Sequence, residues 1–375
     1  MAQDNRVNIS VHNSKHVAIA AGDGASASAD TVTAERSDRD DRAVVDRASP
    51  RVIAQEIHDR YALYHADCMD VLRGLDDGSI GYSIFSPPFA SLYTYSASPR
   101  DLGNVATHDE FHEQHRHVLE QLFRVIAPGR LMSMHCMVLS ASKMRDGFIG
   151  LLDFRGDLIR ACRAVGFIFH SEVTIWKDPV NAMQRTKALG LLHKQIKKDS
   201  AMSRQGIPDY LVTFRKPGVN AEPIAHTDET FPVDLWQRYA SPVWATVEDD
   251  ASSLSSGFHR GKTDNERAKI SQLCLADMGK YATIGADINP SDTLQFRSAR
   301  EDDDERHICP LQLEVIRRAV RLWSNPGDVV LSPFSGIGSE GYVALQEGRR
   351  FCGCELKESY YKQMVGNMAA VAGPS

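Results

Sequence analysis

The first residues that could do chemistry are Ser86-Pro87-Pro88-Phe89, which we call the proline turn. The turn follows a strand-like run, Tyr82-Ser83-Ile84-Phe85. Two successive prolines have fixed φ angles and donate no backbone hydrogen bonds, so the turn is predicted to be stiff and extended. A stiff turn that carries a hydroxyl, a carbonyl and an aromatic ring can hold a flat ligand with little reorganisation. The proline turn therefore predicts a site for a planar molecule.

A second candidate site lies between Asp328 and Gly341, where the chain reads DVVLSPFSGIGSEG. A predicted strand runs into glycines and then a helix, and we call residues 332–341 the glycine loop. Glycines let a ligand approach the backbone, and Glu355, at the end of the next predicted strand, can accept hydrogen bonds from two ribose hydroxyls. The GxGxxG spacing is shared by dinucleotide sites and other adenosine-cofactor sites. Plain helix–strand packing is the alternative interpretation.

The elements that must position both motifs alternate along the chain. The apolar patterns predict strands and helices in turn: a strand and a helix within 61–75, a helix from 109 to Pro128-Gly129, strand 131–139, helix 157–166, strands 167–176 and 207–216, helix 311–323, strand 328–334, helix 340–348 and strand 349–356. This alternation predicts an α/β fold with a doubly wound, mostly parallel sheet. Ligands of such sheets bind at the carboxyl ends of the strands, where both motifs lie.

The chain order limits the choice of cofactor. Only about 20 residues follow Glu355, too few to finish the first half of a dinucleotide fold. The rest of the sheet must therefore come from the strands within 61–216. The alternative interpretation as an oxidoreductase would be supported by the GxGxxG spacing alone.

These residues resemble a known family. Ser86-Pro87-Pro88-Phe89 resembles the catalytic motif of amino-group DNA methyltransferases, and SPFSGIGSE, from Ser332 to Glu340, resembles their S-adenosylmethionine loop. The catalytic motif precedes the cofactor loop, which is similar to the β class of that family. The resemblance covers most of residues 50–368. It implies a Rossmann-like methyltransferase sheet with an inserted, irregular recognition lobe, and double-stranded DNA as the partner.

The resemblance also implies roles for individual residues. The catalytic residues would be Ser86, Pro87, Pro88 and Phe89. The cofactor-binding residues would be Asp67, Ile308, Pro310, Ser332, Phe334, Gly336, Gly338 and Glu355. Asp67 stands where the family places an acid facing the adenine, and residues 307–311 are similar to the segment before the cofactor strand. No metal ion is expected, because Cys352-Gly-Cys354 has no second pair to complete a zinc site.

The target base is inferred from the first residue of the proline turn. Within the family, Ser-Pro-Pro goes mostly with the cytosine N4 amino group and Asp-Pro-Pro with the adenine N6 amino group. Ser86 therefore favours cytosine, with adenine as the alternative. Ser332 departs from the Asp that the family often has in its cofactor loop. Two further functions fit the same residues: methylation of an amino group in protein or RNA, and nucleic-acid binding by a vestigial methyltransferase fold.

Composition and resemblance together suggest four regions: a disordered tail at 1–48, a catalytic part at 49–176, a target-recognition region at 177–304 that includes strand 207–216, and a cofactor-binding part at 305–370. The net charge of the chain is −6, but residues 177–216 hold nine Lys and Arg against three Asp, a net charge of +6. We expect Lys194, Lys197, Lys198 and Arg204 to contact DNA phosphates. A solvated helix face is the alternative.

Cellular location and partners are less constrained. No apolar run approaches the roughly 20 residues of a membrane span, and seven scattered cysteines favour reduced thiols, so we expect a cytoplasmic protein that is associated with the nucleoid through DNA. The sequence leaves open whether the chain forms a homodimer. It also leaves open whether a separate restriction endonuclease acts beside it.

Overall fold

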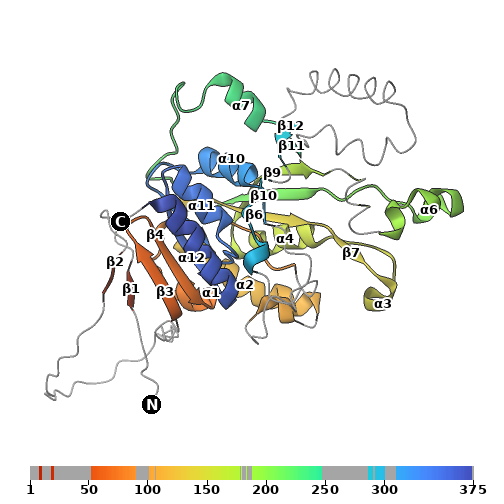
Figure 1. Cartoon of the computed structure of the whole chain (residues 1–375), viewed down its shortest axis with the longest axis horizontal. Coiled ribbons are helices and arrows are strands. Elements are labelled where there is room, and N and C mark those ends of the chain that lie inside the picture. The colour runs from red at the N-terminus through yellow and green to blue at the C-terminus, as the bar shows by residue number, and fades with distance from the viewer. Residues whose placement is uncertain are drawn as a thin grey trace, which may run out of the picture.

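The computed structural model describes most of the chain (Figure 1): residues 8–10, 18–20, 52–89, 101–105, 107–177, 188–246, 286–289, 292–299 and 310–373, together with Pro179 and Met183. None of the helices in these ranges is both long and apolar enough to cross a membrane.

The core of the molecule is a sheet of ten strands in the order β12-β11-β9-β10-β6-β5-β13-β14-β4-β3. The strands are β3 Val52–His58, β4 Tyr61–Ala66, β5 Ile80–Phe85, β6 Ile126–Met137, β9 Ile168–Trp176, β10 Asp209–Arg215, β11 Val243–Thr246, β12 Ala286–Ile288, β13 Val329–Ser332 and β14 Arg350–Glu355. The neighbours from β4 through β14, β13 and β5 to β6 are parallel, whereas β10 is antiparallel to both β6 and β9.

Helices cover both faces of the sheet. One face packs against α1 Cys68–Gly74, α2 His108–Val125 and α4 Phe154–Val165. The other packs against α10 Leu313–Trp323, α11 Ser339–Gln346 and α12 Glu358–Ala372, the blue helices of Figure 1. The prediction of a doubly wound, mostly parallel α/β sheet is confirmed.

Local sequence explains where the helices begin and end. Thr107 caps α2 through a hydrogen bond from the Glu110 N–H, and the apolar residues of α2 recur on one buried face. Helix α4 ends at Gly166, whose φ of 115° favours glycine. The predicted end of α2 at Pro128-Gly129 is wrong by a few residues, because β6 already begins at Ile126.

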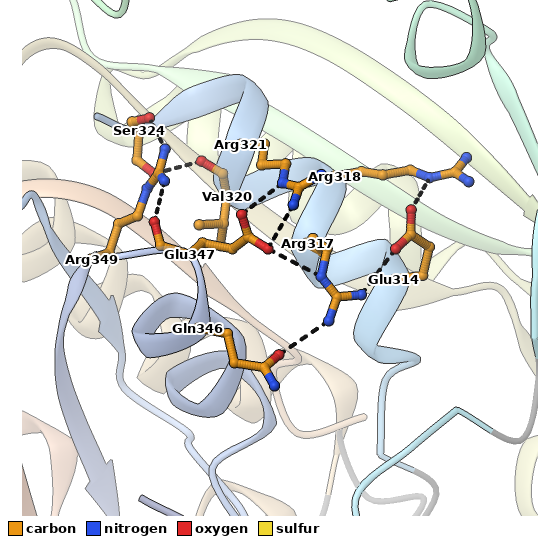
Figure 2. A network of polar contacts seen from close by, with 9 residues as sticks. All are labelled: Glu314, Arg317, Arg318, Val320, Arg321, Ser324, Gln346, Glu347 and Arg349. Atoms are coloured by element: carbon orange, nitrogen blue, oxygen red, sulfur yellow. Dashed lines mark hydrogen bonds and ion pairs between the residues drawn. The ribbon is translucent and has the colours of Figure 1, made fainter. Parts of the chain in front are cut away.

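An arginine-rich network joins α10 to the end of α11 (Figure 2). Arg317 and Arg321 both donate to the Glu347 carboxylate, at 3.1 and 2.6 Å from their Nε atoms. The fully buried Arg318 pairs with Glu314 and lies over the rings of Tyr239 and Trp244. The Glu347 contacts hold α10 and α11 together in the helix layer next to the glycine loop. Arg318 also holds the segment 233–246 against α10.

The remaining described elements lie around this sheet. A hairpin of β7 Leu139–Ala141 and β8 Gly150–Leu152 carries α3 Lys143–Asp146 and projects with α6 His193–Lys198 (Figure 1). Short helical turns lie at η2 Leu102–Asn104, η3 Leu189–Leu191, η4 Ser200–Met202 and η6 Arg297–Ala299. Helix α7 spans Val233–Tyr239. Within the predicted tail, β1 Asn8–Ser10 pairs with β2 Ala18–Ala20, and the rest of 1–48 lies outside the described residues.

Candidate active site

The parallel register aligns the predicted site residues along one edge of the sheet. Strands β4, β14, β13 and β5 are adjacent and run in the same direction, so their carboxyl ends meet there. Asp67 follows β4, Glu355 ends β14, the glycine loop starts at the end of β13, and Ser86 follows β5. The rings of Phe85 and Phe334 lie 5.7 Å apart. Two motifs that are distant in sequence therefore lie side by side at this edge.

The glycine loop is held by the carboxylate of Glu355. The Gly336 N–H donates to one Glu355 oxygen at 2.8 Å, and the Lys357 N–H donates to the other at 2.8 Å. Gly338 has a φ of 87°, and a Cβ there would meet Met364 at 2.8 Å, so only glycine fits. A Cβ on Gly336 would meet no atom within 4 Å. The loop therefore leaves open space beside its backbone, as a bound cofactor requires.

Two carboxyl groups at the loop have altered acidity. Burial, with a smaller contribution from the nearby Asp101, raises the pKa of Glu355 to about 7. Burial raises the pKa of Glu340, in the first turn of α11, to about 8. Near neutral pH both groups can be uncharged in the protein without ligand, and a ligand that donates hydrogen bonds to Glu355 would favour its ionised form.

Glu340 should make stability depend on pH. In the folded protein the Glu340 carboxyl prefers its protonated form. Its contribution to the free energy of unfolding is therefore complete below the pKa that Glu340 has in the unfolded chain, and it is lost as pH rises toward 8. We expect Glu340→Gln to match the wild type near pH 4.5 and to exceed its free energy of unfolding by about 1–3 kcal/mol at pH 8. Denaturant titrations without ligand measure this difference. Glu358→Gln, an exposed control, should show no such trend, and an equal trend in both variants would contradict the assignment.

The proline turn carries a chain of polar contacts that was not predicted. The Ser86 hydroxyl lies 3.0 Å from His135 Nδ1. His135 Nε2 lies 2.9 Å from Asp209 Oδ2, and the Lys177 ammonium pairs with the same oxygen. His135 and Asp209 are buried on β6 and β10. Opposing effects set the acidity of Asp209: burial would raise its pKa, but His135 and Lys177 lower it to about 2.

Aromatic rings form the wall beside the proline turn. The Phe89 ring is partly exposed and packs edge-on against His135 and the buried Phe154, with centroids 6.5 and 6.0 Å apart. Phe111 and His115 continue this cluster, and His115 reaches Phe334 of the glycine loop at 6.5 Å. Burial keeps the pKa of His115 far below its ordinary value, at about 3, so its ring is neutral. Phe111, His115 and Phe154 are buried, so the partly exposed Phe89 and Phe334 carry the ring surface of this cluster that a ligand could reach.

The other predicted residues differ in their surroundings. Asp67 caps α1 by accepting from the Met69 N–H at 2.9 Å and is partly exposed. Pro310 is partly buried, and Ile308 lies outside the described residues. The Ser332 side chain is fully buried, so it packs inside the protein at the end of β13.

The predicted DNA-contacting residues lie on α6 and shortly after it, and α6 projects from the main sheet (Figure 1). Lys194, Lys197 and Lys198 are exposed on α6. Arg204 is partly buried and donates to Ser140 of β7 at 3.3 Å. The basic segment therefore lies against the β7–β8 hairpin.

Three polar residues near the two motifs were not predicted from the sequence, and Lys177 was counted only as part of the basic segment. The three are His135, Asp209 and Asp101. The only signals were a histidine inside the apolar run LMSMHCM and an aspartate at the start of the apolar run DYLVTF. Neither signal says which strands are neighbours. Within the described residues, no group of three His, Cys, Asp or Glu side chains could hold a metal ion.

Comparisons with known proteins identify a family and several relatives. A protein family described as DNA methylase matches residues 82–366. The DNA adenine methyltransferase YhdJ of Escherichia coli K12 is 26% identical over 212 residues, which are 53% of this chain and 70% of that protein. The type II methyltransferase M1.MboII of Moraxella bovis is 42% identical over 57 residues, 15% of this chain and 22% of that one.

Two solved structures share the fold. TTHA0409 of Thermus thermophilus, a candidate DNA modification methylase crystallised with S-adenosyl-L-methionine, has a TM-score of 0.53 at 20% identity and covers 84% of this chain and 97% of its own. The cytosine-N4-specific PvuII DNA methyltransferase has a TM-score of 0.51 at 14% identity over 82% of this chain and 86% of that one. Because the family match spans most of the chain and the proline turn precedes the glycine loop, this protein belongs to the DNA methylase family of amino-group (N6/N4) methyltransferases, in its β class.

Proposed function

We propose that the protein transfers a methyl group from S-adenosyl-L-methionine to the N4 amino group of a cytosine flipped out of duplex DNA. One observation carries this proposal: the proline turn and the glycine loop end the adjacent parallel strands β5 and β13, so a base and a cofactor can meet between them. The open backbone at Gly336 and the carboxylate of Glu355 fit an adenosine cofactor. When bound, the cofactor supplies an electrophilic methyl group.

The residues of the chain would act on the base and hold the cofactor. An exocyclic amino group is a poor nucleophile because its lone pair is delocalised into the ring. The Ser86 hydroxyl and the Pro87 carbonyl would accept its two N–H groups and favour the geometry that can attack, and the prolines hold these acceptors in place. Phe89 would offer a face to the base. Removing the base from the duplex costs a few kcal/mol of stacking and pairing, which the pocket must offset.

The cofactor would lie along the edge formed by β4, β14 and β13. Asp67 would face the adenine, Glu355 the ribose hydroxyls, and Phe334, Gly336 and Gly338 the remainder. Ile308, Pro310 and Ser332 would complete this part of the site.

The choice of cytosine depends on Ser86. The cytosine-N4-specific PvuII enzyme supports it through a shared fold, whereas the adenine-specific YhdJ of E. coli supports N6 methylation of adenine. Hydrogen-bond geometry does not discriminate, because both bases have a ring nitrogen beside the amino group. Adenine N6 is therefore the second candidate.

Digestion of the product DNA tests the function. The protein is incubated with labelled S-adenosyl-L-methionine and mixed-sequence duplex DNA, and the nucleosides are then separated. N4-methylcytosine is expected. N6-methyladenine as the sole product would overturn the base assignment and leave the reaction class standing. No methylated nucleoside under conditions where both ligands bind would overturn the reaction itself.

The recognition region would bind the DNA backbone. Lys194, Lys197 and Lys198 are exposed together on α6, and the net charge of residues 177–216 opposes that of the whole chain. Action on chromosomal DNA would place the protein in the cytoplasm, at the nucleoid. We also propose a homodimer, which sedimentation can test. A separate restriction endonuclease is a further proposal, which the neighbouring genes can test.

Salt dependence tests the basic surface of α6. Replacing Lys194, Lys197 and Lys198 with glutamine should weaken DNA binding and reduce the slope of log K against log salt, by up to about 0.9 for each phosphate that is no longer neutralised. Fluorescence anisotropy at several salt concentrations measures the slope. A control that neutralises Arg116, Arg160 and Lys362, exposed on three other helices, removes the same charge. An equal slope in the α6 variant and the wild type would make these lysines an ordinary solvated surface.

A further inference from the structure

Ser86, His135 and Asp209 form a chain of hydrogen bonds across three neighbouring strands. Phe85 of β5 is in register with Met134 of β6, so Ser86 and His135 are the next pair along. On the other side of β6, Leu211 of β10 is opposite His135, and Asp209 lies two residues further toward the same edge. The two contacts measure 3.0 and 2.9 Å. The register of the sheet therefore brings these three polar groups into a line.

The charge of Asp209 sets the direction of these hydrogen bonds. Its pKa of about 2 makes it a carboxylate at any working pH, and a carboxylate only accepts. His135 Nε2 must therefore carry a hydrogen, and when the ring is uncharged this leaves Nδ1 as an acceptor. The nearby hydroxyl then donates to Nδ1, so the lone pairs of the Ser86 oxygen are left for the substrate.

The methylation reaction needs a proton acceptor at this place. As the new N–C bond forms and the S–C bond of the cofactor breaks, the amino nitrogen becomes positively charged and must lose one proton. On the basis of the function proposed above, we propose that Ser86, His135 and Asp209 are a proton relay. The amino proton passes to the Ser86 oxygen as the hydroxyl hydrogen passes to His135 Nδ1, and the imidazolium that results is stabilised by Asp209. His135 later releases the proton to water.

Lys177 adjusts this relay. Its ammonium pairs with the Asp209 oxygen that also accepts from His135, and it reduces the negative potential at the imidazole ring. Among the residues that the structure describes, Asp209 pairs with His135 and Lys177 pairs with Asp209, and the Ser86 hydroxyl and the Phe89 ring lie beside the imidazole.

The test measures single-turnover methyl transfer against pH at saturating cofactor and DNA. His135→Asn keeps an acceptor for the Ser86 hydroxyl but cannot take up a proton. We expect its rate constant to fall by about 10²-fold, with the Kd values for S-adenosyl-L-methionine and DNA unchanged within twofold. Only the wild type passes a proton through residue 135, so the pH dependence of its rate should differ from that of the variant. Since burial also raises the pKa of Glu355 to about 7, the difference between the two profiles is the readout.

Two further variants make the test independent of folding defects. Ser133→Ala removes a buried hydroxyl two residues before His135 on the same strand, and it should keep both the rate and the profile of the wild type. Lys177→Met should shift the dependence of the rate on pH to higher pH, because the Asp209 charge next to His135 then lacks its second positive partner.

Each outcome decides the question. A wild-type rate and profile in His135→Asn would overturn the relay, as would a Lys177→Met profile that is unmoved or shifted to lower pH. If His135→Asn does not fold by circular dichroism, the Lys177→Met profile decides alone. Failure of the proposed function is a separate result, because the wild type itself would then give no methylated nucleoside.

Discussion

Replacing Ser86 with alanine is expected to lower the rate of methyl transfer by about 10²-fold or more, the scale of removing one preorganised polar group from a transition state. The hydroxyl would accept from the reacting amino group, and it lies 3.0 Å from His135 Nδ1, so its loss would remove both the proposed acceptor and the proposed route for the proton. The turn itself is held by Pro87 and Pro88 and should keep its shape. The Kd for S-adenosyl-L-methionine should stay the same, because the cofactor would lie on β13, β14 and β4. Single-turnover assays and calorimetry separate these two effects.

Ser83→Ala is the matched control for this prediction. Ser83 lies on the same strand and its hydroxyl donates to the Leu331 carbonyl at 2.9 Å, within the buried sheet. Its removal should cost stability and leave the rate of transfer intact. If Ser86→Ala retained full activity, the Pro87 carbonyl would be the principal acceptor and the role given to the hydroxyl would be wrong.

The parts of the site that could be predicted are those in which the chemistry is continuous in sequence. The proline turn needs four successive residues, and the glycine loop needs a strand, glycines and a helix in that order. Each leaves a local pattern that depends on φ angles and on missing side chains. The parallel sheet then follows from the alternation of helix and strand, and it fixes the edge where both motifs meet.

The relay residues could not be predicted, because they depend on which strands are neighbours and in what register. His135 and Asp209 each look like an isolated polar residue next to an apolar run. Only the antiparallel insertion of β10 between β6 and β9 brings Asp209 within reach of His135. A pattern of alternating residues fixes the faces of a strand but not its partner.

The position of β10 also changes how the recognition region is understood. We predicted strand 207–216 as part of the region 177–304, and the structure places it as β10 inside the main sheet. Lys177, the first residue of that region, contacts Asp209 directly. The strand predicted within the recognition region therefore belongs to the main sheet.

Glu355→Ala is expected to weaken binding of S-adenosyl-L-methionine by about 1–3 kcal/mol, the usual cost of losing hydrogen bonds to a charged group. This corresponds to roughly a 5- to 150-fold increase in Kd. Two effects add here. The ribose hydroxyls of the cofactor would lose their proposed acceptor. The Gly336 and Lys357 N–H groups, which donate to the Glu355 carboxylate, would lose theirs as well. Calorimetry with folded protein measures the change.

The pH dependence of cofactor binding distinguishes this role from a purely structural one. Since burial raises the pKa of Glu355 to about 7, hydroxyl donors from the ligand must compete with its proton below that pH. Cofactor affinity of the wild type should therefore rise between pH 6 and 8, and the rise should vanish in Glu355→Ala. Glu358→Ala removes an exposed carboxylate three residues away and should keep both the affinity and its pH dependence. An unchanged Kd in folded Glu355→Ala would remove Glu355 from the cofactor site, whereas a weaker but equally pH-dependent Kd would leave it as a support for the glycine loop alone.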